Sequence, residues 1–296
     1  MGVSAKVLTR LLDLSDRGLL PPGASIMELG AQQLYCKGSE SFIAEFVKRV
    51  SARNPANKSR ITTAELDRLA NGGLTSGLLK ACGFHYSAID IFDAEGTILF
   101  DLNREEPTPE MRNRYDLVTN FGTTEHIINQ YLAFKTVHEM TKPGGIMYHE
   151  LPLAGFHMHG YFSYNPLLFI QVAEANQYEV VMQAYGKNDR DFHPAPDFML
   201  QNGFSDAGYY DLGIEFIFRK KADAPFRVPL ETSTSLDVSP VFLASLSRGE
   251  TAPGDVAYGL VGTARGDITK FSGRELQREL LKRYKRRILA IFKPQV

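Results

Sequence analysis

Apolar residues follow two different periods along this chain. Short, almost wholly apolar runs predict strands, and they alternate with segments in which apolar residues return every three or four positions, which predict helices. The predicted strands are 25–29, 86–90, 97–101, 115–120, 146–150, 178–184 and 213–219. Apolar strands that alternate with helices are typical of a parallel sheet covered on both faces, and two late consecutive strands indicate an antiparallel pair. We therefore expect an α/β fold with a doubly wound, mostly parallel seven-stranded sheet and an antiparallel edge strand.

Helical segments extend this alternation at three places. An amphipathic helix is expected at 5–17, ahead of the first strand, and a helical insertion at 36–83, between the first and second strands. After Lys221 the chain becomes rich in Pro, Ser, Thr and Ala, and a basic amphipathic helix is expected from 272 to 292. The expected organisation is thus one α/β domain at 1–221 and a C-terminal extension at 222–296.

Charge and cysteine content limit the function classes. The 296 residues carry a formal net charge of −1, but the segment from Arg265 onward holds ten Lys and Arg against three Asp and Glu, so an acidic body precedes a basic tail. Only Cys36 and Cys82 are present, which excludes a disulfide framework and favours a cytoplasmic location. No apolar run approaches the length of a membrane span, and the N-terminal pattern predicts a helix rather than a signal peptide.

Glycine and polar residues gather where the predicted strands end. Ligands of doubly wound sheets bind beyond the carboxyl ends of the strands. The first strand ends in Glu28-Leu29-Gly30-Ala31-Gln32, the next two in Asp90 and in Asp101-Leu102, and the fourth in Asn120-Phe121-Gly122, with Glu125-His126 just beyond. Asp90 is placed to accept hydrogen bonds from ribose hydroxyls, and Asp101 to accept one from an exocyclic amine. The first turn lacks the glycine pattern of a pyrophosphate site, so these groups suit an adenosine.

The fourth strand leads into a helix that carries Ile127, Ile128, Tyr131 and Leu132. Thr123 or Thr124 can cap that helix, which would place Glu125 and His126 at its start.

The residues at the ends of the first four predicted strands, together with Lys142-Pro143-Gly144-Gly145 before the fifth strand, resemble the motifs of class I S-adenosylmethionine-dependent methyltransferases. The resemblance covers residues 25–220. It implies a Rossmann-like catalytic domain at 1–221, S-adenosyl-L-methionine as cofactor, and a set of cofactor-binding residues: Glu28, Gly30, Ala31, Gln32, Asp90, Asp101, Leu102, Asn120, Phe121, Gly122, Glu125 and His126. Two features depart from the family pattern. Only one glycine stands in the first motif, and Asp90 follows Glu28 by 62 residues, with Asp93 as an alternative acid.

A segment rich in catalytic residue types follows the fifth strand. Residues 155–166 place His157, His159, Tyr161 and Tyr164 at the mouth of the expected pocket, and histidine is the commonest general base. We expect His157 or His159 to deprotonate a substrate hydroxyl, with Tyr161 or Tyr164 orienting it. The alternative is a loop whose side chains only stabilise the fold. The His-x-His pair could also hold a metal with Glu150 or Asp197, but no third ligand stands at motif spacing, so no metal is predicted.

Three functions compete at this point. The first is O-methylation of a small-molecule or sugar hydroxyl, which the absence of a catalytic Pro-Cys or Asn-Pro-Pro-Tyr motif favours over methylation of a nucleobase. The second is RNA modification, with the basic C-terminal helix contacting phosphates. The third is a non-catalytic adenosine-binding protein, suggested by the single glycine. A helix added at each end is compatible with a homodimer.

Overall fold

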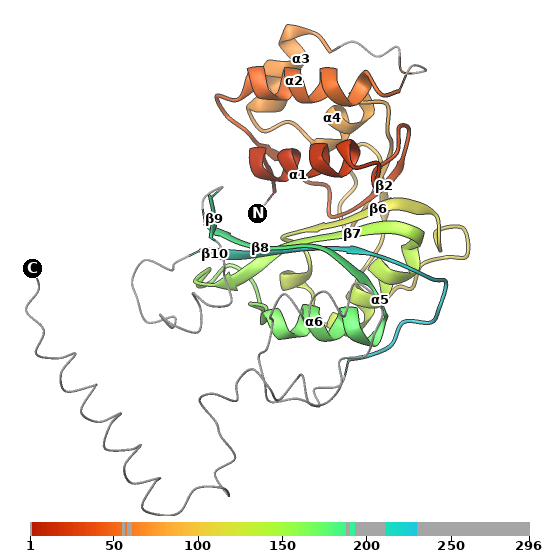
Figure 1. Ribbon diagram of the computed structural model, residues 1–296. Coiled ribbons are helices and arrows are strands. Elements are labelled where there is room, and N and C mark those ends of the chain that lie inside the picture. The colour runs from red at the N-terminus through yellow and green to blue at the C-terminus, as the bar shows by residue number, and fades with distance from the viewer. Residues whose placement is uncertain (1, 55–56, 58–60, 188–189, 193–210, 230–296) are drawn as a thin grey trace, which may run out of the picture.

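One mixed sheet lies between two layers of helices (Figure 1). The computed structural model describes residues 2–54, 57, 61–187, 190–192 and 211–229. The basic helix expected at 272–292, the basic tail and most of the extension at 222–296 lie outside these residues. Residues 222–229, the part of the expected extension that the structure describes, contain no helix or strand.

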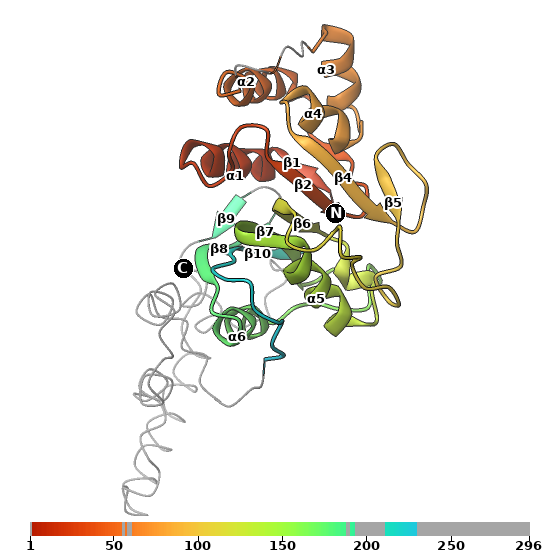
Figure 2. The ribbon, with the colours of Figure 1, turned by 90° about the vertical axis from the view of Figure 1, so that its right-hand side faces the viewer.

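The sheet has the strand order β5-β4-β2-β6-β7-β10-β8-β9 among the described residues. Its members are β2 (Ser25–Leu29), β4 (His85–Asp90), β5 (Thr97–Leu99), β6 (Tyr115–Phe121), β7 (Thr141–Ala154), β8 (Glu179–Lys187), β9 (Arg190–Phe192) and β10 (Leu212–Arg219). The five strands from β5 to β7 are parallel, whereas β10 is antiparallel to both β7 and β8. The predicted α/β fold with a mostly parallel sheet is confirmed, and short β9 adds an eighth strand at the edge opposite β5 (Figure 2).

The expected helical insertion lies between β2 and β4. It contains α2 (Glu40–Ser51), α3 (Thr63–Ala70) and α4 (Thr75–Ala81). Helix α3 begins with a capping box, in which Thr62 and Glu65 each accept a hydrogen bond from the other's backbone N–H. Together with α1 (Ala5–Asp16) these helices cover one face of the sheet (Figure 1). A small parallel pair, β1 (Val3–Ser4) and β3 (Leu34–Tyr35), ties the N-terminus to the segment after β2.

The opposite face is covered by α5 (Gln130–Met140) and α6 (Pro166–Ala175). Helix α6 starts at Asn165-Pro166, where Asn165 Oδ1 accepts the amide of Leu167 at 2.9 Å and proline occupies the first helical position. The predicted cap of α5 is wrong. The chain first makes a 3₁₀ turn, η1 (Thr124–His126), and α5 begins only after Asn129, whose Oδ1 accepts the amide of Leu132.

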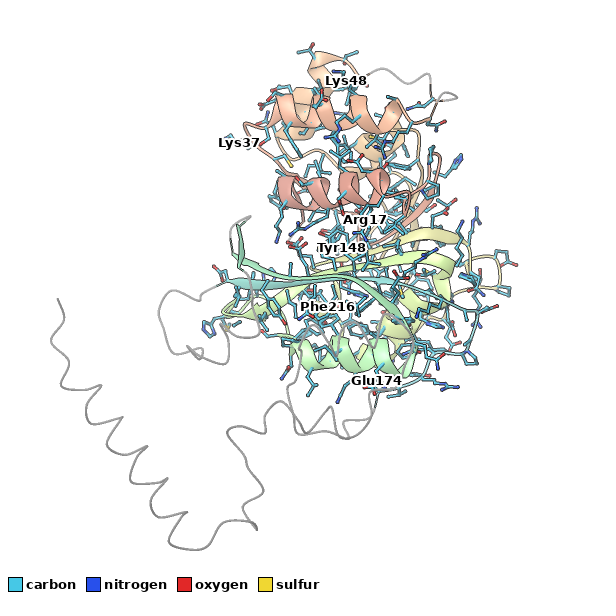
Figure 3. All side chains as sticks on the ribbon, viewed as in Figure 1. Arg17, Lys37, Lys48, Tyr148, Glu174 and Phe216 are labelled. Atoms are coloured by element: carbon cyan, nitrogen blue, oxygen red, sulfur yellow. The ribbon has the colours of Figure 1, made fainter. Side chains whose placement is uncertain are left out.

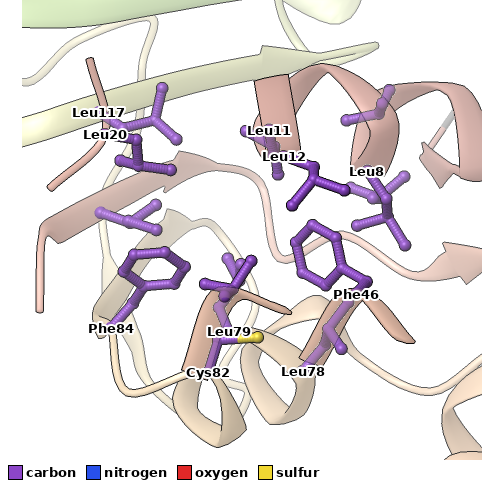
Figure 4. Packing of buried hydrophobic residues seen from close by; sticks show 14 of the residues in the cluster. Leu8, Leu11, Leu12, Leu20, Phe46, Leu78, Leu79, Cys82, Phe84 and Leu117 are labelled. Carbon is purple, nitrogen blue, oxygen red and sulfur yellow. The ribbon is translucent and has the colours of Figure 1, made fainter. Parts of the chain in front are cut away.

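Two apolar cores result, one on each face of the sheet. Tyr148 of β7 is buried on the α1 side and Phe216 of β10 on the α6 side (Figure 3). On the α1 side, side chains from α1, α2 and α4 close over Leu117 of β6 (Figure 4). The insertion is therefore part of the domain core, where it packs with Ile26 of β2 and Leu117 of β6.

Candidate functional site

The loop after β2 is a tight turn built on a single glycine. Gly30 has a φ of +71°, a backbone conformation that favours glycine, and its amide donates to the carbonyl of Ile89 at 2.8 Å. Where the family usually has further glycines, the side chain of Gln32 crosses the turn. Its Nε2 donates to Thr123 Oγ1 at 3.1 Å and to the carbonyl of Leu29 at 3.2 Å. The chain's own side chains therefore give this loop the rigidity it needs at a ligand site.

Glu28, the next-to-last residue of β2, stabilises the loop through hydrogen bonds of its carboxyl group. Its carboxyl group is buried and accepts hydrogen bonds from the amide of Gln32 at 3.0 Å and from the hydroxyl of Tyr86 at 2.5 Å. Burial raises the pKa of Glu28 to about 7, and the Tyr86 hydrogen bond opposes that rise. Glu28 thus faces protein groups, so the role it fits is positioning the loop.

Asp90 joins the same loop to the end of β4. Its Oδ2 accepts the amide of Ala31 at 2.9 Å and its Oδ1 accepts the amide of Phe92 at 3.1 Å. Next to it, the side chains of Ile91 and Phe92 are 64% and 72% exposed. A carboxylate beside exposed apolar side chains fits a ribose and the flat, weakly polar face of an adenine, as predicted for the cofactor.

The end of β5 adds a second acid. Asp101 Oδ1 accepts the amide of Asn103 at 2.8 Å, which shapes the turn, and Leu102 is buried beneath it. Asn103 Oδ1 in turn accepts the amides of Ile128 and Asn129. These hydrogen bonds fix the turn after β5 to the segment after β6, as Asp90 joins the end of β4 to the loop after β2.

The end of β6 is a buried polar turn. Asn120 is fully buried, donates to Thr124 Oγ1 at 2.9 Å and to Nδ1 of His149 at 3.1 Å, and accepts the amide of Thr124. Phe121 is buried edge-on against Tyr148, and Gly122 donates its amide to the carbonyl of Glu150 on β7. The hydroxyl of Thr124 accepts the Asn120 hydrogen bond and that of Thr123 donates to the carbonyl of Leu29, so neither threonine caps α5.

Glu125 and His126, just beyond this turn, meet His159 from the loop after β7. Oε1 of Glu125 lies 3.9 Å from Nε2 of His126 and 3.6 Å from Nε2 of His159, and the two imidazole rings are 5.1 Å apart. The Glu125 side chain is completely buried, and neither of its carboxylate oxygens has a hydrogen-bond partner among the described residues. We call these three residues the Glu-His-His cluster.

Backbone contacts hold the two segments of the cluster together. The amides of Tyr161 and Phe162 both donate to the carbonyl of Glu125, at 2.8 and 3.2 Å. Gly160 lies directly against the Glu125 side chain, and a Cβ at that position would come within 2.9 Å of Glu125 Cγ. This packing leaves no room for a side chain at position 160, and the close approach of Gly160 helps to bury the Glu125 side chain.

The same burial shifts the pKa of each group in the cluster. Burial raises the pKa of Glu125 to about 7. Burial lowers the pKa values of His126 and His159, and the neighbouring His159 adds to the effect on His126. Both shifts favour the neutral form of the imidazoles, in which a ring nitrogen can accept a proton or bind a metal.

A cavity of about 620 Å³ opens beside this cluster, between the N-terminus and the ends of β7, β8 and β10. It is lined by Gly2, Ser4, Lys6, Tyr35, Glu150, Phe156, His157, His159, Gly186, Asp211 and Gly213. Lys6 forms ion pairs with Glu150 at 3.2 Å and with buried Glu215. Both predicted catalytic histidines thus face one polar cavity, whereas Tyr161, which is 70% exposed, is not among its lining residues.

Tyr164 and two buried histidines have structural contacts within the fold. Tyr164 is buried, and its hydroxyl lies 2.9 Å from Thr124 Oγ1 and from Gln130 Oε1. His149 is buried among phenylalanines, which lowers its pKa to about 3. His138 lies between the hydroxyl of Tyr178 and the carbonyl of Ala224, and burial lowers its pKa to about 4.

Sequence reasoning missed the grouping of the cluster. It named Glu125, His126 and His159 separately, and it considered Glu150 and Asp197 as metal ligands beside His159. Asp197 lies outside the described residues, and Glu150 forms an ion pair with Lys6. The one local signal was Gly160 directly after His159, because a glycine permits the close packing that brings the two segments together.

The family follows from a direct comparison of the sequence. A family model described as "Methyltransferase domain" matches residues 37–189, which is just over half of the chain. The chain therefore belongs to this family and is an S-adenosylmethionine-dependent methyltransferase. The matched region starts after the β2 loop, so it does not include the first motif with its single glycine, Gly30. No protein of curated function matches the sequence.

Several solved structures that resemble the chain are described as methyltransferases. A proposed sarcosine dimethylglycine methyltransferase from Galdieria sulphuraria is 12% identical, with a TM-score of 0.43 over 73% of this chain and 85% of that one. The 1,6-didemethyltoxoflavin-N1-methyltransferase of Burkholderia thailandensis is 10% identical, with a TM-score of 0.40 over 73% and 77%. Phosphoethanolamine N-methyltransferase 2 of Haemonchus contortus is 12% identical, with a TM-score of 0.38 over 72% and 53%. With sequence identities and TM-scores this low, the matches do not indicate which substrate this chain methylates.

Among the helices of the described residues, none combines the length and the apolar composition that crossing a bilayer requires.

Proposed function

We propose that this methyltransferase transfers the methyl group to a hydroxyl oxygen of a small molecule or sugar bound in the cavity beside His157 and His159. The observation that carries the proposal is that both histidines, chosen from the sequence as candidate bases, line the same cavity. A volume of about 620 Å³ lies within the range of small-ligand sites, and the lining includes the charged side chains of Lys6, Glu150 and Asp211. A hydroxyl-rich substrate would find both donors and acceptors on these walls.

The residues of the chain would divide the work as follows. When bound, S-adenosylmethionine supplies an electrophilic methyl group on its sulfonium. Asp90 and the turn after β5 hold the adenosine, and the loop at Gly30 fixes the opposite end of the cofactor site. A histidine of the cavity accepts the hydroxyl proton while the new oxygen–carbon bond forms and the sulfur–carbon bond breaks. His159 fits this role because its Nε2 lies 3.6 Å from the carboxylate of Glu125, which would stabilise the imidazolium.

Replacing both histidines tests this proposal. We expect His157→Ala/His159→Ala to lower turnover at least about 100-fold, the usual contribution of a general base, while the Kd for S-adenosylhomocysteine changes less than about threefold. Turnover is measured as S-adenosylhomocysteine released with a panel of hydroxylated small molecules. His85→Ala, an exposed histidine of β4, is the control. Full activity of the double variant would refute the role of the cavity histidines.

RNA modification is the remaining alternative, and its motivating feature, the basic tail, lies outside the described residues. A salt-dependent gel shift with RNA distinguishes it, because phosphate contacts weaken steeply as salt rises. Binding of RNA by the full chain but not by a chain truncated before Arg265 would favour it.

A further inference from the structure

The Glu-His-His cluster has the composition of a metal site. Two imidazole nitrogens and one carboxylate oxygen come from two separate segments, and their ligand atoms all lie within 4.8 Å of one another. Two histidines with one carboxylate form a recurrent ligand set for zinc and for iron(II), and such sites keep positions open for water or substrate. We propose that Glu125, His126 and His159 bind one divalent transition-metal ion of the zinc class at the wall of the cavity.

The distances fit a shared ion. Ligands about 2.1 Å from a zinc ion lie roughly 3.4 Å apart when the geometry is tetrahedral. Nε2 of His159 and Nε2 of His126 lie 3.6 and 3.9 Å from the same oxygen of Glu125, Oε1. These separations are too long for hydrogen bonds, but they leave room for an ion between the three atoms. Small rotations of the two partly exposed imidazoles would complete the coordination.

A second observation points to a cation at this place. The carboxyl group of Glu125 is completely buried, and neither oxygen has a hydrogen-bond partner among the described residues. A buried polar group without a partner is costly, so a carboxylate in this position calls for an ion or a water molecule beside it. The hydrogen bonds from Tyr161 and Phe162 to the Glu125 carbonyl, and the contact with Gly160, hold this carboxylate facing His159. The site is thus built before any ion arrives.

The position of the cluster gives the ion a role, and this part rests on the proposed function. His159 belongs both to the cluster and to the lining of the cavity, so an open coordination position would face a bound substrate. An ion there would bind the acceptor hydroxyl and lower its pKa, as a Lewis acid does. Because Nε2 of His159 would then be bound to the ion, His157, which lines the same cavity, would take over as the base and accept the proton. The oxygen would attack the methyl carbon as its bond to sulfur breaks. A substrate with two neighbouring oxygens could chelate the ion.

The test is metal binding by the full chain after removal of metals with a chelator. Zn²⁺ alone is titrated by calorimetry, and Co²⁺ alone is followed by its visible absorption, which reports tetrahedral nitrogen and oxygen ligands. We expect one ion per chain. Loss of groups that only orient metal ligands costs 10- to 100-fold in affinity, so loss of a ligand should cost more than about 100-fold in Glu125→Gln, His126→Ala and His159→Ala. The His157→Ala and His85→Ala variants should bind like the wild type.

Several results would overturn the inference. These are the absence of stoichiometric binding, binding that all three cluster variants retain, or an equal loss in His85→Ala. Folding is checked by thermal unfolding of each variant. Should Glu125→Gln unfold, the exposed His126→Ala variant decides alone. The proposed function is judged separately. Turnover that survives chelation while His157→Ala/His159→Ala is inactive would keep the histidine base and refute the role of the ion.

Discussion

Gly30→Ala measures how much the single-glycine turn contributes to folding and to cofactor binding. Gly30 has a φ of +71°, where an L-residue costs about 1–2 kcal/mol. The new methyl group would also lie 3.0 Å from Thr123 Oγ1 and 3.1 Å from Gln32 Nε2. Those two atoms are hydrogen-bonded to each other and to the carbonyl of Leu29, so the methyl group must displace at least one of these bonds.

The structure offers a matched control for the backbone part of this cost. Gly18 has the same φ of +71°, and a Cβ there would meet nothing within 4 Å. Gly18→Ala should therefore lower the free energy of unfolding by about 1–2 kcal/mol through strain alone. Gly30→Ala should lower it by a further 1–2 kcal/mol or so, because each lost hydrogen bond contributes roughly 0.5–1.5 kcal/mol.

Two measurements are compared across the pair. Urea unfolding gives the free energy of each variant, and calorimetric titration with S-adenosylhomocysteine gives its Kd. We expect Gly30→Ala to raise the Kd at least about tenfold, because displacing Gln32 moves the amide of Ala31 away from Asp90, whereas Gly18→Ala should leave the Kd unchanged. Equal effects of the two variants in both measurements would refute the reasoning.

Three further predictions concern polar side chains that are buried or partly buried. Asp90→Asn should raise the Kd for S-adenosylhomocysteine at least about tenfold, because an amide nitrogen cannot accept the backbone N–H groups that Asp90 now binds; an unchanged Kd would exclude Asp90 from the cofactor site. Glu28 keeps its proton up to about pH 7 in the fold but to about 4.5 when unfolded, so its contribution to stability falls as pH rises through this window. Between about pH 5 and 8.5, Glu28→Gln should therefore lose roughly 2–3 kcal/mol less unfolding free energy than the wild type; parallel curves would contradict this. Lys220 Nζ donates to Asn113 Oδ1 and to the carbonyls of His138 and Thr141, so Lys220→Met should lower the free energy of unfolding by about 2–4 kcal/mol without changing the Kd; a stable variant would show that water replaces these bonds.

Much of the fold could be predicted because its signals are local. β2 has the predicted bounds, a capping box of Thr62 and Glu65 starts α3, and Asn165 caps α6. Each of these features depends on residues within a few positions of one another, so the sequence pattern contains all the information they need. The cap of α5 failed for the opposite reason. Thr123 and Thr124 bond instead to groups on other elements, Leu29 and Tyr164 among them.

The sequence by itself determined the class of protein: an alternation of apolar strands and helices, and a set of strand-end motifs that match a methyltransferase. The tertiary structure decided how the site is assembled. Glu125 and His159 are far apart in the sequence, and only the packing of the loop after β7 against η1 brings them within 3.6 Å. Likewise, the Gln32 side chain crosses the turn at Gly30 because the pairing of β2 with β6 places Thr123, its hydrogen-bond acceptor, beside that turn. Contacts between distant segments depend on the strand order of the whole sheet, and no short stretch of sequence encodes that order.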